Sequence, residues 1–285
     1  MELAKTDYHV HPDYSPDASP YKIKDYCYKA LELGLREICF TTHIEVDPVR
    51  KELDNYVIFK GKEVSVFDQA WLDHYFLEIA DVQREFKSSG LQVKAGIEVG
   101  YSQGMEKFIE KITDGYPFDF VLGAIHCLEH IAISSKNESP YYYKNRSIEQ
   151  IANDYFTVLE DAVKSGLFDC MAHLDIYVRY GLQFFGDEIY TIHQGRIEPI
   201  FQEMARRGMG IEINTSSRRR GIEEFHPSKE IVALAAETGI KVFTIGSDAH
   251  NLSELGGYLD EAMQILQELN LKNHVFNRRR AVPYG

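Results

Sequence analysis

The stretch KVFTIGSDAH at residues 241–250 is the most telling feature of the chain, because an apolar run ends there in Asp248 and His250. Six other apolar runs end in similar polar residues: DYHVH (7–11), EICFTTH (37–43), VKAGIEV (93–99), DFVLGAIH (119–126), DCMAHLD (169–175) and GIEINTS (210–216). Short apolar runs of this kind are typical of buried strands. Parallel strands in a barrel bring residues at their C-terminal ends around one mouth. The pattern therefore predicts a barrel with a polar mouth.

The segments between these runs carry helical signals, so the chain alternates strand and helix and is expected to be an α/β protein. Helices are expected over residues 21–33, 69–89, 105–113, 147–164, 187–207, 227–238 and 255–270. Ser19 and Pro20 offer a cap and a first residue for the earliest of them. Two long connections, 44–68 and 127–146, follow strand ends and are expected to form walls or lids over the mouth.

Length and composition favour one globular domain over residues 1–285, with 44% hydrophobic and 26% charged residues. The net charge of −13 disfavours nucleic acid and anionic membranes as partners. The first residues lack a signal-like apolar stretch and no run is long enough to span a bilayer, so a cytoplasmic location is expected. Four scattered cysteines, Cys27, Cys39, Cys127 and Cys170, predict buried thiols rather than disulfides. The oligomeric state is left open.

Histidines and carboxylates at the strand ends suggest a metal centre. His9 and His11 are two residues apart on an extended segment, so both project from one side of it. Such a pair alone is more often two ordinary hydrogen-bonded histidines than a metal site. Asp248 and His250 repeat the spacing at the other end of the chain, and further candidates end the strands between them: His43, Glu98, His126 and His173. The whole set therefore favours metal binding.

The motifs DYHVHPDYSPDA, TTH, GIEVG, GAIH, AHLD and GSDAH resemble those of the PHP (polymerase and histidinol phosphatase) superfamily, in order and over nearly the whole chain. The run from INTSSRRRG to GSDAH is most similar to the stand-alone histidinol-phosphatases of that superfamily. The resemblance implies a distorted (β/α)7 TIM-like barrel with a trinuclear metal centre. That strand number agrees with the seven apolar runs.

The resemblance also implies three ligand sets. The first is His9, His11, Glu98 and Asp248, the second Glu98, His126 and His173, and the third Asp17, His43 and His250. Glu98 would bridge two ions, and Glu98, Asp248 and His250 would act in catalysis. Asp17 lies in Pro16-Asp17-Ala18, where the family more often has Ser-Asp-Gly, and it can also be read as a turn or cap residue.

Imidazoles and carboxylates suit three divalent transition-metal ions, with zinc, manganese and iron all compatible. Cys127 follows His126 but should face the opposite side of its strand, so it is not expected to bind metal. Such ions hold a hydroxide ready to attack phosphorus, and arginines near the mouth would hold the phosphate oxygens. The candidates are Arg179 and Arg218, the latter from a basic run that is otherwise typical of a solvated face.

The expected reaction is hydrolysis of L-histidinol phosphate to L-histidinol and phosphate, in histidine biosynthesis, so the partner is a small phosphorylated substrate. Asn214, Glu224 and the tyrosines at 141–143 can line the pocket or simply pack. Two alternatives stay open. One is a PHP phosphoesterase that acts on nucleotides or phosphotyrosine, and the other is a non-catalytic metal-binding regulatory protein.

Overall fold

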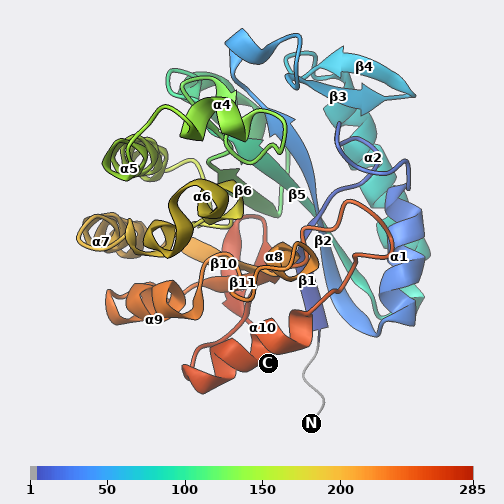
Figure 1. Cartoon of the computed structure of the whole chain (residues 1–285). Coiled ribbons are helices and arrows are strands. Elements are labelled where there is room, and N and C mark those ends of the chain that lie inside the picture. Colours follow the sequence, from blue (N-terminus) through green and yellow to red (C-terminus); the bar gives the residue numbers. More distant parts are fainter. Residues whose placement is uncertain (1–4, 285) are drawn as a thin grey trace.

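The computed structural model describes residues 5–284, and its centre is a seven-stranded parallel barrel surrounded by helices (Figure 1). Residues 1–4 and 285, which belong to the expected domain, lie outside the described part. The barrel strands are β1 (Lys5–Val10), β2 (Leu35–Glu45), β5 (Gln92–Gly100), β6 (Phe120–Ala124), β9 (Cys170–Met171), β10 (Gly210–Asn214) and β11 (Phe243–Gly246), hydrogen-bonded in that order. The predicted distorted (β/α)7 barrel is confirmed.

The longer helices pack around this barrel and are α1 (Ile23–Glu32), α2 (Ala70–Glu85), α3 (Glu106–Gly115), α5 (Ile148–Ser165), α7 (Ile197–Arg207), α9 (Lys229–Glu237) and α10 (Leu259–Glu268). Helix α5 shows why they form. The Ser147 hydroxyl accepts from the backbone N–H of Gln150, and the Gln150 side chain accepts from the N–H of Ser147. This capping box starts the helix, and Gly166 ends it with a left-handed φ of 71°.

Two helix expectations were wrong. Helix α1 begins at Ile23 rather than after Ser19-Pro20, because the Asp25 carboxylate accepts from the backbone N–H of Lys22 and caps the helix there. The stretch 187–207 is not one helix. It divides into the 3₁₀ segment η3 (Gly186–Thr191) and α7, and Gly195 has a left-handed φ of 74° between them.

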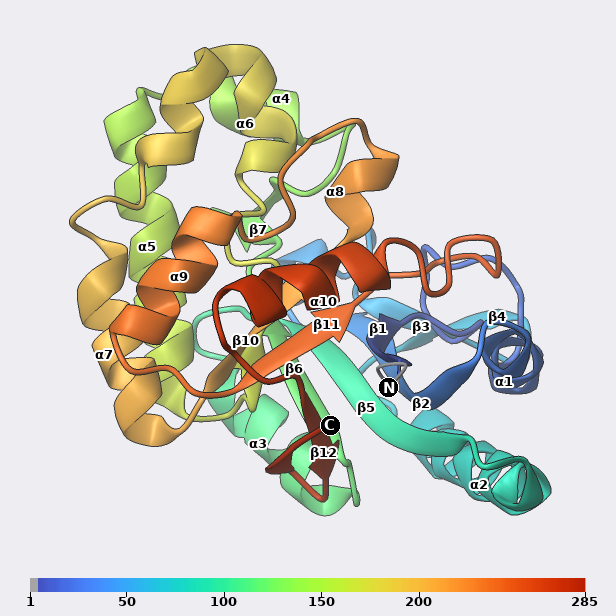
Figure 2. The same ribbon diagram turned by 90° about the horizontal axis from the view of Figure 1, so that it is seen from below.

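The two long connections contain structure of their own. The first includes η1 (Pro48–Arg50) and the hairpin β3 (Tyr56–Phe59)/β4 (Lys62–Ser65), and the second includes the hairpin β7 (Cys127–Leu128)/β8 (Ile131–Ala132) and α4 (Ser139–Tyr143). The sequence did not predict α6 (Val178–Phe185), α8 (Ser216–Arg219), η2 (Lys87–Ser89) or the hairpin β12 (His274–Asn277)/β13 (Arg280–Pro283). Figure 2 shows β12 near the C-terminus, on the opposite side of the barrel from α4, α6 and α8.

The barrel interior is apolar at the end away from α8. Its buried cluster comprises Tyr8, Cys39, Phe120, Leu122, Ala124, Cys170, Ala172 and Phe276. Phe276 comes from β12, and its ring lies 4.7 Å from that of Phe120 between centroids. The C-terminal hairpin therefore closes this end of the barrel. The cysteines are unpaired thiols, and Cys127 is half-buried, unlike the other three.

The first and last barrel strands meet at a seam with few backbone contacts. A single bridge joins Val10 to Ala249, with the His11 N–H donating to the Ala249 carbonyl at 2.9 Å. The buried Asp7 carboxylate adds to it by accepting from the N–H groups of Ser247 and Gly256. Among residues 5–284, no helix has the length and apolar character that a membrane span requires.

Candidate metal centre

The expected ligands reach the mouth from the C-terminal ends of successive strands. His43 on β2 and Glu98 on β5 are direct neighbours in the parallel register. In β1 the register against β2 shifts between Asp7 and Val10, where three steps along β1 oppose two along β2. A bulge of this kind re-aims side chains. It lets Tyr8 pack in the apolar interior while the next residue, His9, also faces into the barrel.

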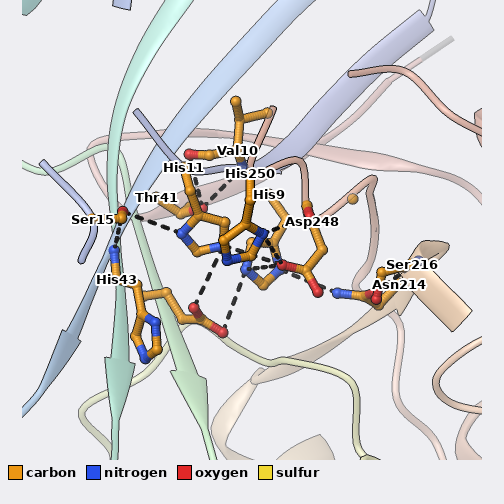
Figure 3. Close-up of polar contacts among 12 residues, drawn as sticks. His9, Val10, His11, Ser15, Thr41, His43, Asn214, Ser216, Asp248 and His250 are labelled. Atoms are coloured by element: carbon orange, nitrogen blue, oxygen red, sulfur yellow. Dashed lines mark hydrogen bonds and ion pairs between the residues drawn. The ribbon is translucent and has the colours of Figure 1, made fainter. Parts of the chain in front are cut away.

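Four residues of the first expected set lie close together. His9 Nε2 is 3.3 Å from Glu98 Oε1 and 3.7 Å from Asp248 Oδ1, and His11 Nε2 is 3.2 Å from the same Asp248 oxygen. Figure 3 shows His9, His11, Asp248 and His250 pointing toward one another. His9 lies on β1 and His11 directly follows it, whereas Asp248 and His250 follow β11. The two pairs therefore face each other across the barrel seam.

Glu98 is the centre of the cluster. Its Oε1 lies 3.1 Å from His173 Nε2 and 3.4 Å from His126 Nε2, while its Oε2 lies 3.7 Å from His11 Nε2. Its two oxygens therefore face different histidines. Burial would raise the pKa of this carboxyl, but the neighbouring His9 and His126 charges hold the pKa well below its usual range. An ionised carboxylate that is only 2% exposed requires positive charge beside it.

Asp17 joins two histidines at the solvent side of the cluster. Its Oδ2 is 3.1 Å from His250 Nε2 and 3.5 Å from His43 Nδ1, and its side chain is 51% exposed. The structure thus brings together the three residues of the third expected set. His43, Glu98 and His126 also offer ligand atoms within 4.8 Å of one another, as do His11, Asp248 and His250. All nine candidates form one continuous cluster.

The donor set fits divalent ions. Among residues 5–284 the buried His9 Nε2 has no hydrogen-bond partner, and the Nε2 atoms of His126 and His173 face each other at 3.3 Å beside Glu98. Burial and the neighbouring His250 lower the pKa of His11 to about 4. In His9, His43, His126 and His250 the nearby carboxylates outweigh burial and raise the pKa, so a cation bound there would displace protons from these imidazoles. Nitrogen lone pairs that converge on carboxylates are what a cation in this mouth would use.

Two of these residues have an uncommon backbone conformation. His173 has φ 28° and Asp248 has φ 55°, in the left-handed region that costs a non-glycine residue about 1–3 kcal/mol when the surroundings enforce it. Both positions follow the last residue of a barrel strand by two. The strain turns each side chain into the mouth and indicates that the ligand geometry is set by the fold.

Arg179 is the arginine that the structure brings to the cluster. Its guanidinium Nη2 lies 3.6 Å from Asp248 Oδ2 and donates to the Ser216 hydroxyl at 3.1 Å. The side chain is 9% exposed, and its Nε has no hydrogen-bond partner within residues 5–284. Burial, together with nearby Arg220, lowers the pKa of Arg179 to about 10. A buried guanidinium with an unused donor is suited to hold an anion.

Arg218 is placed differently. Its Nη2 is 3.1 Å from Glu261 and its guanidinium lies over the Phe225 ring. Its Nε, like that of Arg179, is buried without a partner among residues 5–284, but its charged partner is Glu261 rather than a candidate ligand. Arg219 donates to the backbone carbonyls of Ser247 and Asp248 and so supports the segment that carries a ligand. The structure thus brings only Arg179 of the two expected phosphate arginines to the centre.

The PHP domain family matches residues 7–216, which carry seven of the nine candidate ligands. The chain belongs to the PHP family. The remaining two candidates, Asp248 and His250, follow β11 beyond the matched range, and the barrel brings them to the others across the seam.

Relatives of this PHP chain cover almost its whole length. A probable histidinol-phosphatase of Deinococcus radiodurans is 30% identical over 277 residues, or 97% of this chain and 98% of the relative. A histidinol-phosphatase of Lactococcus lactis is 29% identical over 252 residues, or 87% and 85% of the two chains. The solved structure of histidinol phosphate phosphatase from Lactococcus lactis, complexed with zinc, L-histidinol and phosphate, matches with a TM-score of 0.79 and 22% identity over 99% of this chain and 100% of that one. The last likeness shows the fold.

Other residues singled out in the sequence take mixed places in this PHP barrel. Asn214 is buried, and its amide lies 3.4 Å from His9 Nδ1. Tyr142 and Tyr143 are buried in the wall, where their hydroxyls donate to Asp154 and to the Tyr177 carbonyl, whereas Tyr141 is 73% exposed. Glu224 lines a separate cavity of about 520 Å³ beside Tyr190. Tyr142 and Tyr143 therefore pack in the wall rather than reach the ligand cluster.

Three polar partners of the ligands were missed from sequence. The Glu212 carboxylate lies 2.6 Å from His9 Nδ1, Glu45 lies against both His43 and His126, and the Ser15 hydroxyl is 3.4 Å from His11 Nδ1. Glu212 lies inside the apolar run 210–216, whereas Glu45 is the last residue of β2 and lies two positions beyond the run 37–43. An acid inside a buried run needs a partner, and that requirement could have drawn attention to Glu212.

Proposed function

We propose that this chain is a metal-dependent phosphomonoesterase that hydrolyses L-histidinol phosphate to L-histidinol and phosphate. The observation that carries the proposal is the buried Arg179, whose guanidinium stands beside a ligand carboxylate of the metal cluster with a donor still free. A cation centre with a guanidinium beside one of its carboxylates suits a phosphoryl group. The names of the full-length relatives support the particular substrate.

In this proposal three divalent ions are held by nine residues, with Glu98 shared between two ions, and the domain extends over residues 1–285. The ions are held by His9, His11, Asp17, His43, Glu98, His126, His173, Asp248 and His250. Bound divalent ions lower the pKa of a coordinated water, which makes it nucleophilic at neutral pH, and they neutralise phosphate charge. Zinc, manganese and iron all suit these nitrogen and oxygen donors.

Side chains of the protein bind and orient the substrate. Arg179 holds non-bridging phosphate oxygens, and Ser216, which accepts from its guanidinium, fixes its direction. A cavity of about 280 Å³ adjoins the cluster at Asp17, His43 and His126, and its far wall includes Asp54 and Glu138 from the two long connections. Both carboxylates already form ion pairs with the buried Arg50 guanidinium, so the cavity offers room for the alcohol part of the substrate rather than free negative charge.

A panel of phosphate monoesters tests the proposal. Phosphate release is measured for histidinol phosphate, p-nitrophenyl phosphate, phosphotyrosine and nucleoside monophosphates, with the same protein after chelation as the control. We expect the highest kcat/KM for histidinol phosphate and no release after chelation. A preference for a nucleotide or phosphotyrosine would replace the substrate but keep the reaction. No release from any monoester by metal-loaded protein would favour a non-catalytic, metal-binding regulatory protein.

A further inference from the structure

Glu45 stands between two candidate ligands that belong to different sets. Its Oε1 lies 2.6 Å from His126 Nδ1 and 2.9 Å from His43 Nε2, and the residue is 5% exposed. An ionised carboxylate can only accept, and one of its oxygens has two lone pairs, so both imidazoles can donate to the same atom. With both donating, the tautomers of both rings are set at once, and the 3.1 Å between His43 Nε2 and His126 Nδ1 is then the distance between two donors around one acceptor.

The tautomer of each imidazole decides which ring nitrogen keeps the lone pair that can bind an ion. With Nδ1 protonated, His126 keeps the lone pair on Nε2, the atom that faces Glu98 at 3.4 Å and His173 at 3.3 Å. With Nε2 protonated, His43 keeps the lone pair on Nδ1, which faces Asp17 at 3.5 Å. The two histidines are thereby turned toward different ions by one carboxylate. Carboxylates behind metal-binding histidines orient the ring and raise its basicity.

The space for this carboxylate is provided by a glycine. Gly100 is the register partner of Glu45 across β2 and β5, and a Cβ added to Gly100 would overlap the Glu45 carboxylate. The same arrangement recurs on the other side of the barrel. A Cβ on Gly246 would overlap the Glu212 carboxylate, which lies behind His9. Glu212 contacts the imidazole of His9 and the backbone N–H of His173, whereas Glu45 contacts two imidazoles.

We propose that Glu45, seated against Gly100, is a positioning residue that couples two metal sites by orienting His126 toward one and His43 toward the other. The inference rests on the proposed ligand sets and not on the proposed substrate. It leads to a specific expectation: disturbing Glu45 weakens two ions together, whereas disturbing Asp17, a ligand of the third set alone, weakens one. A direct ligand of a single ion would not show this pairing.

The experiment is a zinc titration of the full chain against a competing chelator, which reads the affinity of each bound equivalent without any activity assay. We expect Glu45→Ala to weaken two equivalents about 10–100-fold and Asp17→Asn, at a ligand of the third set alone, to weaken one. Gly100→Ala should reproduce the effect of Glu45→Ala, because the new methyl displaces the carboxylate. Gly115→Ala is the control, since a Cβ there meets no atom within 4 Å and the affinities should stay at wild-type values.

The double variant Glu45→Ala/Gly100→Ala separates positioning from backbone damage. Once the carboxylate is gone, the methyl at residue 100 has lost its main clash, so the double variant should bind zinc as Glu45→Ala does. Additive losses, weakening of only one equivalent in Glu45→Ala, or unchanged affinities would overturn the inference. Should Gly100→Ala fail to fold, Glu45→Ala and Asp17→Asn still decide the question. A wild-type chain that binds no zinc would instead refute the proposed metal centre.

Discussion

The two ends of the barrel are built from the same strands but filled with opposite chemistry. At one end Tyr8, Phe120 and Phe276 close the interior with aromatic rings. At the other end the chain continues from the same strands into buried histidines and carboxylates, with Glu98 in their midst. Residues at the closed end stabilise the barrel. Residues at the mouth form the candidate metal centre, which requires charged groups to be buried. Changes at the two ends should therefore separate stability from activity.

Removal of metal should produce the largest effect. Exhaustive chelation is expected to abolish phosphate release and to lower the melting temperature together, because ions bound only by the folded chain stabilise it by mass action. Elemental analysis of protein purified without chelator should find more than one transition-metal equivalent per chain. Full activity in a metal-free sample would contradict the centre.

Glu98→Gln should be the most damaging single substitution for turnover, since it removes the charge that faces His9, His126 and His173. The chelated variant should still fold, because the change lies at the mouth and removes a buried charge. Steady-state kinetics with melting curves of chelated samples check both parts. Retention of more than about a tenth of wild-type kcat, a loss below roughly 1.4 kcal/mol, would show that Glu98 is not shared between ions.

Phe276→Ala tests the closed end. The side chain is 3% exposed and packs on Tyr8 and Phe120, so truncation should reduce the free energy of unfolding by about 3–5 kcal/mol. At a temperature where the variant is folded, kcat and bound metal should match those of wild type. Denaturant unfolding and elemental analysis provide the two measurements. A fall in metal content would mean that the two ends are not independent.

Arg179→Ala should lower kcat/KM for the phosphorylated substrate while the metal content stays unchanged. The expected loss of transition-state stabilisation is about 2–4 kcal/mol. Arg218→Ala is the matched comparison. It was expected from sequence to act in the same way, but its pairing with Glu261 predicts a smaller loss. Kinetics and metal analysis on the same samples distinguish the two arginines. Equal losses would place both guanidiniums on phosphate during turnover.

The candidate ligands at the mouth were easier to predict from sequence than the carboxylates that contact those ligands. His43 and His126 end apolar runs, and the barrel geometry gathers such ends whatever their separation in the chain. Glu45 and Glu212 lie inside or beside the same runs, and their role depends on contacts with histidines far away in sequence. The alternation of side chains along a strand does not predict such a contact.

Local departures from regular structure were also beyond the sequence pattern. The bulge in β1 lets adjacent Tyr8 and His9 both face inward, which contradicts simple alternation. The hairpin β12/β13 follows the last predicted helix and is stabilised by packing under the barrel, where Phe276 N–H donates to the Tyr8 hydroxyl. Its position depends on tertiary contacts that local propensity does not report.

The seam between β1 and β11 has a consequence for how the protein is made. Asp248, the neighbour of His11 across the seam, is synthesised 237 positions after it (248 − 11). At about 5–20 residues per second, roughly 12–50 s separate their synthesis. During that interval the nascent chain contains the His11 imidazole without its carboxylate partner. The complete set of ligands therefore exists only after Asp248 and His250 have been added.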